Sequence, residues 1–261
     1  MTNIDTIIND LKSLGIRDGD TLLVHSSFKS INLHDITPGS VIECLIKCVG
    51  NHGTLIMPSL SYSQKPRNIH DVKLTPSNVG VMSEIFRTSF STKRSLHPTH
   101  SVCAMGHLTE YYISDHYMDR TPCGAHSPFR KLLFANAKIL MLGCGLRPNT
   151  TMHAVEEVIG TPYLFGGERV YSVTDINGIT RDITYRDHGF DGWEQRYDRI
   201  ASILDIKCGK IGNALSHLID TQRLFNVALS ALKNDRLAFV AKKSAQQGDA
   251  PEPATNADSA S

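Results

Sequence analysis

The chain has 261 residues, 41% of them hydrophobic and 20% charged, and its 27 basic and 26 acidic residues leave a formal net charge of +1. A chain of this length buries roughly 70–75% of its unfolded surface, so it needs no disulfide or structural metal to hold a core. The near-zero charge excludes a broad basic surface for nucleic acid and disfavours a binder of anionic membranes. No run approaches the roughly 20 apolar residues of a membrane span. Six cysteines and an N-terminus unlike a signal peptide predict reduced thiols in a cytoplasmic protein.

Helical and strand patterns alternate along the first two thirds of the chain. Apolar residues at helical spacing predict an N-terminal helix that ends at Gly15, and Thr37-Pro38 is typical of a second helix start. Further helices are expected near 79–90 and 128–135. Short apolar runs predict buried strands at 21–26, 54–60, 100–106 and 138–143. Strands separated by helices favour an α/β fold with a helix-covered, mostly parallel central sheet.

Beyond residue 160 the pattern changes. Segments 168–176 and 179–187 flank Asn177-Gly178, which is a strong signal for an antiparallel hairpin. C-terminal helices are expected at 191–204, about 211–219 and 221–233. We expect residues 1–242 to form a single domain. Residues 243–261 contain no large apolar side chain and predict a disordered tail.

His153 is the strongest candidate for a catalytic side chain. It follows a predicted strand and a glycine-containing turn, and ligands of open α/β sheets bind outside the carboxyl ends of strands. Thr150 or Thr151 can cap the helix that carries it, and Glu156 and Glu157 can share its face. A carboxylate favours the charged imidazole and a helix N-terminus the neutral one, a balance that suits a general base. A surface helix without a catalytic role can carry the same pattern, and the motif by itself favours neither interpretation.

A second cluster of polar residues spans 94–101. Arg94, Ser95 and Ser101 flank a rigid His97-Pro98 turn at a strand entrance, where such groups suit a ligand's phosphate or amide. The alternative is a loop whose serines bond their own backbone, and the cluster by itself favours this alternative.

A third cluster, residues 25–30, directly follows the first predicted strand. Ser26, Ser27 and Lys29 could hold a pyrophosphate there, although no GxGxxG or Walker A pattern occurs.

Two other kinds of centre have weak support. The spacing of His97, His100 and Cys103 resembles that of zinc ligands. However, His100 and Cys103 would point to opposite faces of a regular strand, so we expect no metal there. Cys144 offers a thiol in a turn, with Arg147 as the one nearby cation.

Taken in order, these segments resemble the aminoglycoside 3-N-acetyltransferase family. The matching pieces are LLVHSSFKSI, GTLIMPSL, VGVMSEIFR, RSLHPTHSVCAMG, SPFRKLL, ILMLGCG and NTTMHAVEE. They span about residues 20 to 160, and a weaker match through HGFDGWEQRY extends towards 235. Each piece is unspecific, whereas seven in the family's order form a specific signal.

The resemblance implies direct acetyl transfer from acetyl-CoA to an amine within a ternary complex, with no metal. His153 corresponds to the family's catalytic base, Glu156 to the acidic residue that orients it or holds the amino sugar, and Thr150 to a threonine near the thioester. The segments that match coenzyme A contacts assign that role to His25, Ser26, Ser27, Phe28, Lys29, Arg94, Ser95, His97, Pro98 and Ser101.

The amine acceptor has two interpretations. The resemblance implies an aminoglycoside antibiotic. However, aminoglycosides are polycations, and a net charge of +1 gives no indication of an acidic cleft that would bind them. A nucleotide-linked amino sugar for a surface polysaccharide is the alternative acceptor. A homodimer is compatible with the sequence. More remote alternatives are a metal- or cysteine-dependent hydrolase and a non-catalytic binding module.

Overall fold

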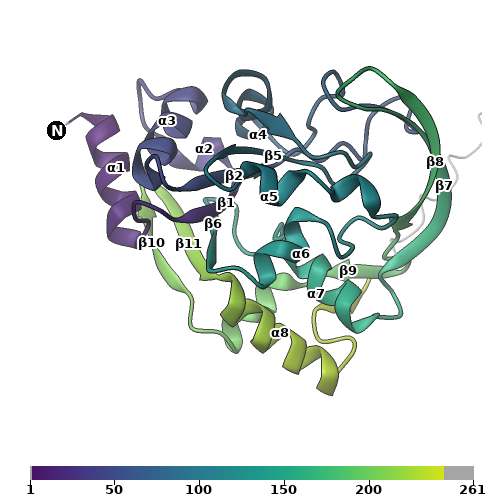
Figure 1. Ribbon diagram of the computed structural model, residues 1–261. Helices are drawn as coiled ribbons and strands as arrows, with labels where there is room; N and C mark the ends of the chain where they lie inside the picture. The colour runs from purple at the N-terminus through teal and green to yellow at the C-terminus, as the bar shows by residue number, and fades with distance from the viewer. Residues whose placement is uncertain (1, 244–261) are drawn as a thin grey trace, which may run out of the picture.

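The computed structural model describes residues 2–243, which are built around a seven-stranded sheet in the order β10-β11-β6-β1-β2-β5-β4 (Figure 1). Its strands are β1 (Thr21–Ser26), β2 (Thr54–Pro58), β4 (Lys93–Arg94), β5 (Val102–Gly106), β6 (Ala137–Leu142), β10 (Lys207–Ile211) and β11 (Ala214–Asp220). In the centre, β6, β1 and β2 pair in parallel, whereas the outer pairs are antiparallel. Five of these seven strands therefore run in one direction, and β5 and β11 run in the other. The predicted α/β class with a mostly parallel sheet is confirmed.

Helices cover both faces of this sheet. The long ones are α1 (Asn3–Leu14), α3 (Pro38–Val49), α7 (Thr151–Ile159) and α8 (Thr221–Asn234). Shorter ones are α2 (Phe28–Ile31), α4 (Val81–Ile85), η1 (Phe86–Phe90), α5 (Thr109–Ile113), η2 (His116–Met118), α6 (Pro128–Leu133) and η3 (Tyr197–Ser202). Figure 1 shows α1 and α3 beside one part of the sheet and α6, α7 and α8 beside another. Helix starts follow the predicted chemistry, because Thr37 and Ser127 cap α3 and α6 and a proline follows each.

The two faces of β1 divide the core into two hydrophobic clusters. Leu22 and Val24 pack with α1 and α3, whereas Leu23 packs with the cluster that holds α6, α7 and α8. Successive strand side chains alternate between faces, so His25 lies on the same face as Leu23. This alternation places an imidazole at the carboxyl end of β1, on the side where α7 lies.

The predicted hairpin is present and carries a second sheet. β7 (Phe165–Thr174) and β8 (Thr180–His188) pair antiparallel, and β3 (Ile69–Asp71) pairs parallel with β7. Gly178 has φ +79° and its amide donates to Asp175, which closes the turn at the predicted dipeptide. In Figure 1 the hairpin curves along the right side of the molecule. β8 ends at His188, and the ring of this histidine therefore lies near the main sheet.

Two of the predicted C-terminal helices are wrong. Residues 191–204 contain β9 (Trp193–Gln195), which pairs with β12 (Val240–Lys242), and then the single-turn 3₁₀ segment η3. Residues 211–219 end β10 and form most of β11, joined at Gly212-Asn213. Gly212 has φ +58°, as a tight hairpin turn requires. The helix predicted at 221–233 is confirmed as α8.

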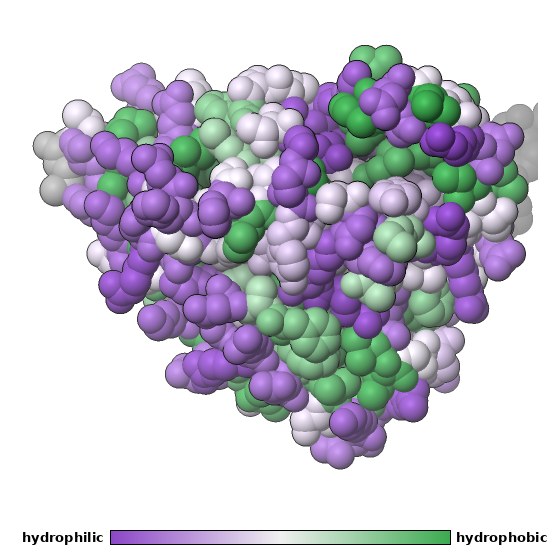
Figure 2. Space-filling view, viewed as in Figure 1, coloured by the Kyte–Doolittle hydropathy of each residue, from purple (hydrophilic) through white to green (hydrophobic). Residues whose placement is uncertain are grey.

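The surface seen in Figure 2 is mostly hydrophilic, with hydrophobic side chains gathered in its lower part, over α6 to α8. No helix among residues 2–243 is long and apolar enough to cross a bilayer. The tail predicted at 243–261 lies outside the described residues except for Lys243, whose amide donates to Gly192. That one domain spans 1–242 stays a prediction.

Candidate active site

A cavity of about 380 Å³ opens at the carboxyl edge of the parallel strands. Ser26 ends β1, Pro58 ends β2, and Cys144 follows β6, and all three line it. This edge is where open α/β sheets bind ligands. Other parts of the wall come from the segment between β2 and α4, the loop before β5, the start of α7, the end of β8 and η3, with His100, Thr150, His153, His188 and Tyr197 among their residues.

His153 lies on the first turn of α7, is 8% exposed and faces this cavity. Its Nδ1 lies 2.7 Å from the Tyr197 hydroxyl and 3.3 Å from Glu156 Oε2. Tyr197 donates to the same carboxylate oxygen at 2.7 Å. Tyr163 donates to the other oxygen, Oε1, at 2.8 Å. Glu156 is fully buried, so the two tyrosines supply its hydrogen bonds.

This arrangement sets the position of the proton on the His153 ring. The Tyr197 hydroxyl has one proton, and the carboxylate of Glu156 accepts it. Nδ1 of His153 must then donate to Tyr197 or Glu156, so it carries the ring proton of the neutral imidazole. Burial, together with the neighbouring Glu156 charge, raises the pKa of Tyr197 well above its ordinary value, so the phenol keeps its proton. The lone pair of the ring is consequently on Nε2.

Burial keeps the other histidines around the cavity uncharged. Burial, with the charge of His153 as a smaller cause, lowers the pKa of His25 to about 3. Burial also lowers the pKa of His100 and of His188 well below the ordinary value. Removing an imidazolium from water costs more free energy than its contacts in the protein supply, so burial favours the neutral ring. The wall therefore holds several uncharged imidazoles.

The start of α7 differs from the sequence prediction. Thr150 occupies the N-cap position with helical φ/ψ, and its side chain makes no capping bond. Asn149 Oδ1 accepts from the Thr151 amide at 3.2 Å instead. The Met152 and His153 amides donate to the carbonyls of Asn149 and Thr150. These three amides are thus engaged, and Thr150 reaches the cavity through its own side chain.

Glu157 does not join Glu156 beside His153. Its Oε1 accepts from His188 Nε2 at 2.8 Å and from the Cys123 amide at 2.7 Å, and its Oε2 accepts from Thr121 at 2.7 Å. Successive carboxylates on α7 therefore orient two different histidines of one wall.

The first segment predicted to contact coenzyme A lies partly at the cavity. His25 and Ser26 line it. Ser27 follows directly, at the N-cap of α2, and within α2 Phe28 packs against the core and Lys29 is exposed. The Ser27 amide donates to Leu142, which fixes this turn against the end of β6.

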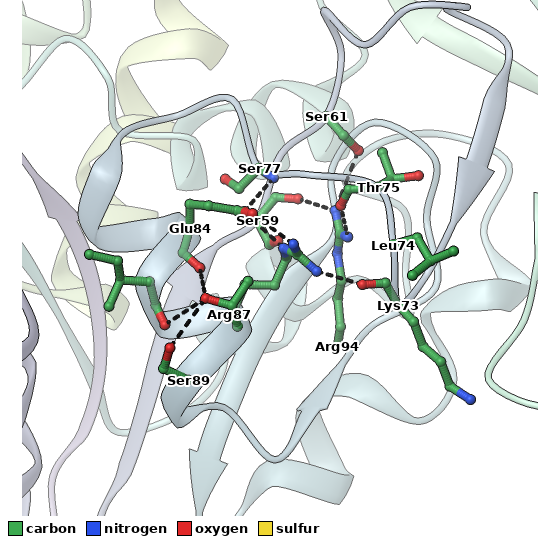
Figure 3. A network of polar contacts seen from close by, with 12 residues as sticks. Ser59, Ser61, Lys73, Leu74, Thr75, Ser77, Glu84, Arg87, Ser89 and Arg94 are labelled. Carbon is green, nitrogen blue, oxygen red and sulfur yellow. Dashed lines mark hydrogen bonds and ion pairs between the residues drawn. The ribbon is translucent and has the colours of Figure 1, made fainter.

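The second predicted segment is not brought to the cavity. The Arg94 guanidinium donates to the carbonyls of Ser59 and Thr75 and to the Ser101 hydroxyl, as part of the network in Figure 3. Ser95 and Ser101 are fully buried, with Ser95 bonded to His116 and Ser101 to Ser59. Ser95 and Ser101 join loops to strands and have no free surface, whereas Arg94 is half-buried and lines a second, separate pocket. Their coenzyme role stays a prediction.

His97 and Pro98 are likewise part of the interior. His97 is fully buried and stacks on His116 at 4.9 Å between ring centroids. Its Nδ1 accepts from the His100 amide at 3.1 Å, and the Pro98 carbonyl accepts from Ser61 at 2.9 Å. His97 therefore supports the loop that carries His100, and the coenzyme contacts predicted for His97 and Pro98 stay a prediction.

The cysteine and zinc alternatives fit this geometry poorly. Cys103 packs in the hydrophobic cluster of α1 and α3, whereas His100 lines the cavity. Cys144 also lines the cavity, but burial raises the pKa of its thiol to about 11, which disfavours the nucleophilic thiolate. A different group could hold a metal ion, since His100, His153 and His188 place ligand atoms within 4.8 Å of one another.

Known proteins place this arrangement in a family. A sequence model described as aminoglycoside 3-N-acetyltransferase matches residues 23–233. The chain belongs to the aminoglycoside 3-N-acetyltransferase family. It is 32% identical over 238 residues to aminoglycoside N(3)-acetyltransferase IV of Salmonella sp, covering 90% of this chain and 88% of the relative.

Members of the aminoglycoside 3-N-acetyltransferase family also share the fold. The apoenzyme of aminoglycoside acetyltransferase AAC(3)-IVa matches with a TM-score of 0.76 and 29% identity over 90% of each chain. YokD of Bacillus subtilis matches with a TM-score of 0.78 and 25% identity, over 89% of this chain and 94% of that one.

Several residues in or behind the cavity of this family member were not predicted from the sequence. Tyr163 and Tyr197 lie in segments interpreted only as a connection and a helix, and His188 ends a strand valued only for its hairpin. The segment HGFDGWEQRY, which contains His188 and Tyr197, matched the family weakly and was the available signal.

Proposed function

We propose that this chain transfers an acetyl group from acetyl-CoA to an amino group of an aminoglycoside, with His153 as the general base. The observation that carries the proposal is the chain of contacts from His153 Nδ1 through Tyr197 to the buried Glu156. That chain leaves Nε2 as the proton acceptor at a cavity wall. A solved protein of the same fold, AAC-IIIb, was crystallised with CoASH, which supports the choice of donor.

An ammonium nitrogen loses two protons on the way to the amide: the first passes to solvent before the attack, and the second is removed by His153. An ammonium group has no lone pair, so the nitrogen attacks the thioester carbon only in its neutral form. His153 Nε2 takes the proton as the nitrogen–carbon bond forms, and general base catalysis of this kind contributes about 10²–10⁴ in rate. The tetrahedral intermediate then expels the coenzyme A thiolate. The proton on His153 can return to that sulfur, which restores the enzyme.

The developing imidazolium and oxyanion each need a partner. Glu156 compensates the charge on His153 through Tyr197, without contacting the substrate. For the thioester oxygen, we assign the Thr150 hydroxyl, because the first amides of α7 are already bonded. A donor at this position is worth about 10²–10³ in rate. His25 and Ser26 line the same cavity and are proposed to contact the coenzyme.

A second acceptor class is favoured by the charge of the wall. Arg67 and Arg147 line the cavity, whereas no aspartate or glutamate among residues 2–243 does. The carboxylates of Glu194 and Asp198 near Arg147 are paired with that arginine. Such a wall suits an amino sugar that carries phosphate better than a polycation. A nucleotide-linked amino sugar is therefore the second candidate acceptor.

The two acceptors are separated by one panel. Purified protein is incubated with acetyl-CoA and with either aminoglycosides or nucleotide-linked amino sugars, and release of the free thiol is followed. The proposal expects thiol release with an aminoglycoside and an acetylated product by mass spectrometry. Transfer confined to nucleotide sugars would replace the acceptor and keep the mechanism. No transfer to any amine would contradict the proposed activity.

A further inference from the structure

Three histidines converge on one point of the cavity from elements far apart in the chain. His100 comes from the loop before β5, His153 from α7 and His188 from the end of β8. Their ligand atoms all lie within 4.8 Å of one another. The ring of His188 is 4.9 Å from that of His153 and 5.1 Å from that of His100, centroid to centroid.

In each ring, one nitrogen is held by an oxygen. His188 Nε2 lies 2.8 Å from Glu157 Oε1, His153 Nδ1 lies 2.7 Å from the Tyr197 hydroxyl, and His100 Nδ1 lies 2.9 Å from Thr99 Oγ1. Histidines that bind a metal are oriented in this way, with the second nitrogen tied to a carboxylate, carbonyl or hydroxyl group. The carboxylate at His188 can only accept, so it fixes the tautomer there. At His153 and His100 the hydroxyl oxygen can accept from the ring, which leaves the other nitrogen with its lone pair.

His188 supplies an independent indication of a ligand. Its side chain is 5% exposed, and its Nδ1 is buried with no hydrogen-bond partner among residues 2–243. Buried polar atoms almost always have a partner, so this atom has room for one from outside the chain. Because Nε2 donates to Glu157, Nδ1 is the atom with the lone pair, which can bind a metal ion or accept a hydrogen bond.

We propose that His100, His153 and His188 form a binding site for a divalent transition-metal ion of the zinc type. Three imidazoles with an open fourth position are a typical ligand set of zinc. Tetrahedral zinc with bonds of about 2.0–2.1 Å needs nitrogens about 3.4 Å apart, so the three nitrogens, which lie within 4.8 Å of one another, must move closer when the ion binds. The fourth position faces the cavity.

This site bears on the proposed function, on which the following step rests. The metal would bind through the His153 lone pair that otherwise takes the amine proton. The metal-bound protein therefore lacks its general base, and zinc inhibits acetyl transfer until a chelator removes it. Metal binding itself does not depend on any acetyltransferase activity.

The test is titration of the metal-free protein with Co²⁺, without acetyl-CoA or an amine. We expect one ion bound per chain and the intense visible bands of tetrahedral cobalt, displaced by Zn²⁺. Absence of binding at one ion per chain, or near-ultraviolet charge-transfer bands from a thiolate, would overturn the proposal, since the latter would place the ion on a cysteine.

Variants locate the ion. His188→Gln and His100→Gln should lose the visible bands, and Glu157→Gln should weaken binding by about 10–100-fold. His107→Gln removes an exposed imidazole after β5 and is the matched control, with unchanged binding. Thermal melts verify that each variant is folded, and the result for the unmodified protein stands without them. Bands that persist in His188→Gln would contradict the assignment.

The inhibition is measured separately, on acetylated product by mass spectrometry, because a free thiol also binds zinc. Zn²⁺ at saturation should abolish product formation, and a chelator should restore it. If zinc binds as described and transfer continues, the regulatory part is wrong and the site stands. If no transfer occurs under any condition, the proposed function fails while the cobalt result is unaffected.

Discussion

At the residue scale, the reactivity proposed for His153 depends on two oxygens next to its Nδ1 atom, those of the Tyr197 hydroxyl and the Glu156 carboxylate. Tyr197 contacts both Nδ1 of His153 and Glu156, each at 2.7 Å, so it is the link between base and carboxylate. Tyr163 contacts the same carboxylate but not His153. These two tyrosines therefore make a matched pair for mutation.

Tyr197→Phe should lower kcat and leave KM nearly unchanged. It removes the hydroxyl that orients His153, and a hydrogen bond to a charged group is worth about 1.5–3 kcal/mol, or about 10–100-fold in rate. Tyr163→Phe removes a hydroxyl of the same type and should have a smaller effect on kcat. Steady-state kinetics over a range of pH measures both, and the acidic limb of the profile, on which the base becomes protonated, should move only in Tyr197→Phe. Equal losses in the two variants would show that Tyr197 has no special positioning role.

The sequence predicted the polar residues of this site better than their contacts. His153, Glu156 and Thr150 lie together because neighbours on a helix are close in space. Arg94, Ser95 and Ser101 have the same polar side chains, yet they bond to backbone carbonyls and to a buried histidine. Whether a hydroxyl faces a ligand or its own fold is decided by packing from distant segments, which spacing does not encode.

At the element scale, the first residues of α7 divide into one that stabilises the helix and one that is proposed to act in catalysis. Asn149 makes the capping bond, whereas the Thr150 side chain makes none and lines the cavity. Adjacent residues thus have different proposed roles, and mutations at the two positions should affect different measurements.

Asn149→Ala should lower the free energy of unfolding by about 0.5–2 kcal/mol, the usual cost of a lost N-cap. Thr150→Val keeps the shape of the side chain but removes the proposed oxyanion donor, so kcat should fall by about 10²–10³. Urea unfolding and steady-state kinetics on both variants test this division. A Thr150→Val enzyme with normal kcat would remove Thr150 from the mechanism.

The segments wrongly predicted to be helices show where the periodicity of hydrophobic residues is ambiguous. In ALSHLID, Leu215, Leu218 and Ile219 have helical spacing, but the segment is β11 and alternates between buried and more exposed positions over much of its length. Gly212-Asn213 before it is a hairpin signal that should outweigh a short helical pattern. Asn177-Gly178 was interpreted correctly because longer strand-like segments flank it.

At the scale of the whole molecule, the site is assembled from β1, the loop before β5, α7, β8 and η3. His25 and Tyr197 are separated by most of the described chain. No local pattern links them, and only the sheet order brings them to one edge. The fold class could therefore be predicted from the sequence, whereas the complete set of histidine and tyrosine side chains at the site could not.

The buried histidines predict instability in acid. The pKa values of His25 and His116 are lowered by burial from 6.5 to about 3. Between these values the unfolded chain binds more protons than the folded one, so the stability that these groups contribute is present above pH 6.5 and is lost as pH falls towards 3. Each such group contributes about 1.4 kcal/mol per pH unit within this window.

Urea unfolding at pH 7 and pH 5 measures this dependence. Stability should fall between the two, and His25→Gln should reduce the fall, because that variant has one fewer buried group to protonate. The exposed His107 gives the control His107→Gln, which should keep the dependence of the unmodified protein. Equal stability at the two pH values would contradict the burial argument.

The most direct test of the central claim compares His153→Ala with the unmodified protein, freed of metal, in the presence of acetyl-CoA and the acceptor identified by the panel. Binding of coenzyme A is measured by calorimetry and acetylated product by mass spectrometry. The account predicts that coenzyme binding persists while the turnover number falls by about 10²–10⁴. Turnover by His153→Ala equal to that of the unmodified protein would show that another group removes the amine proton.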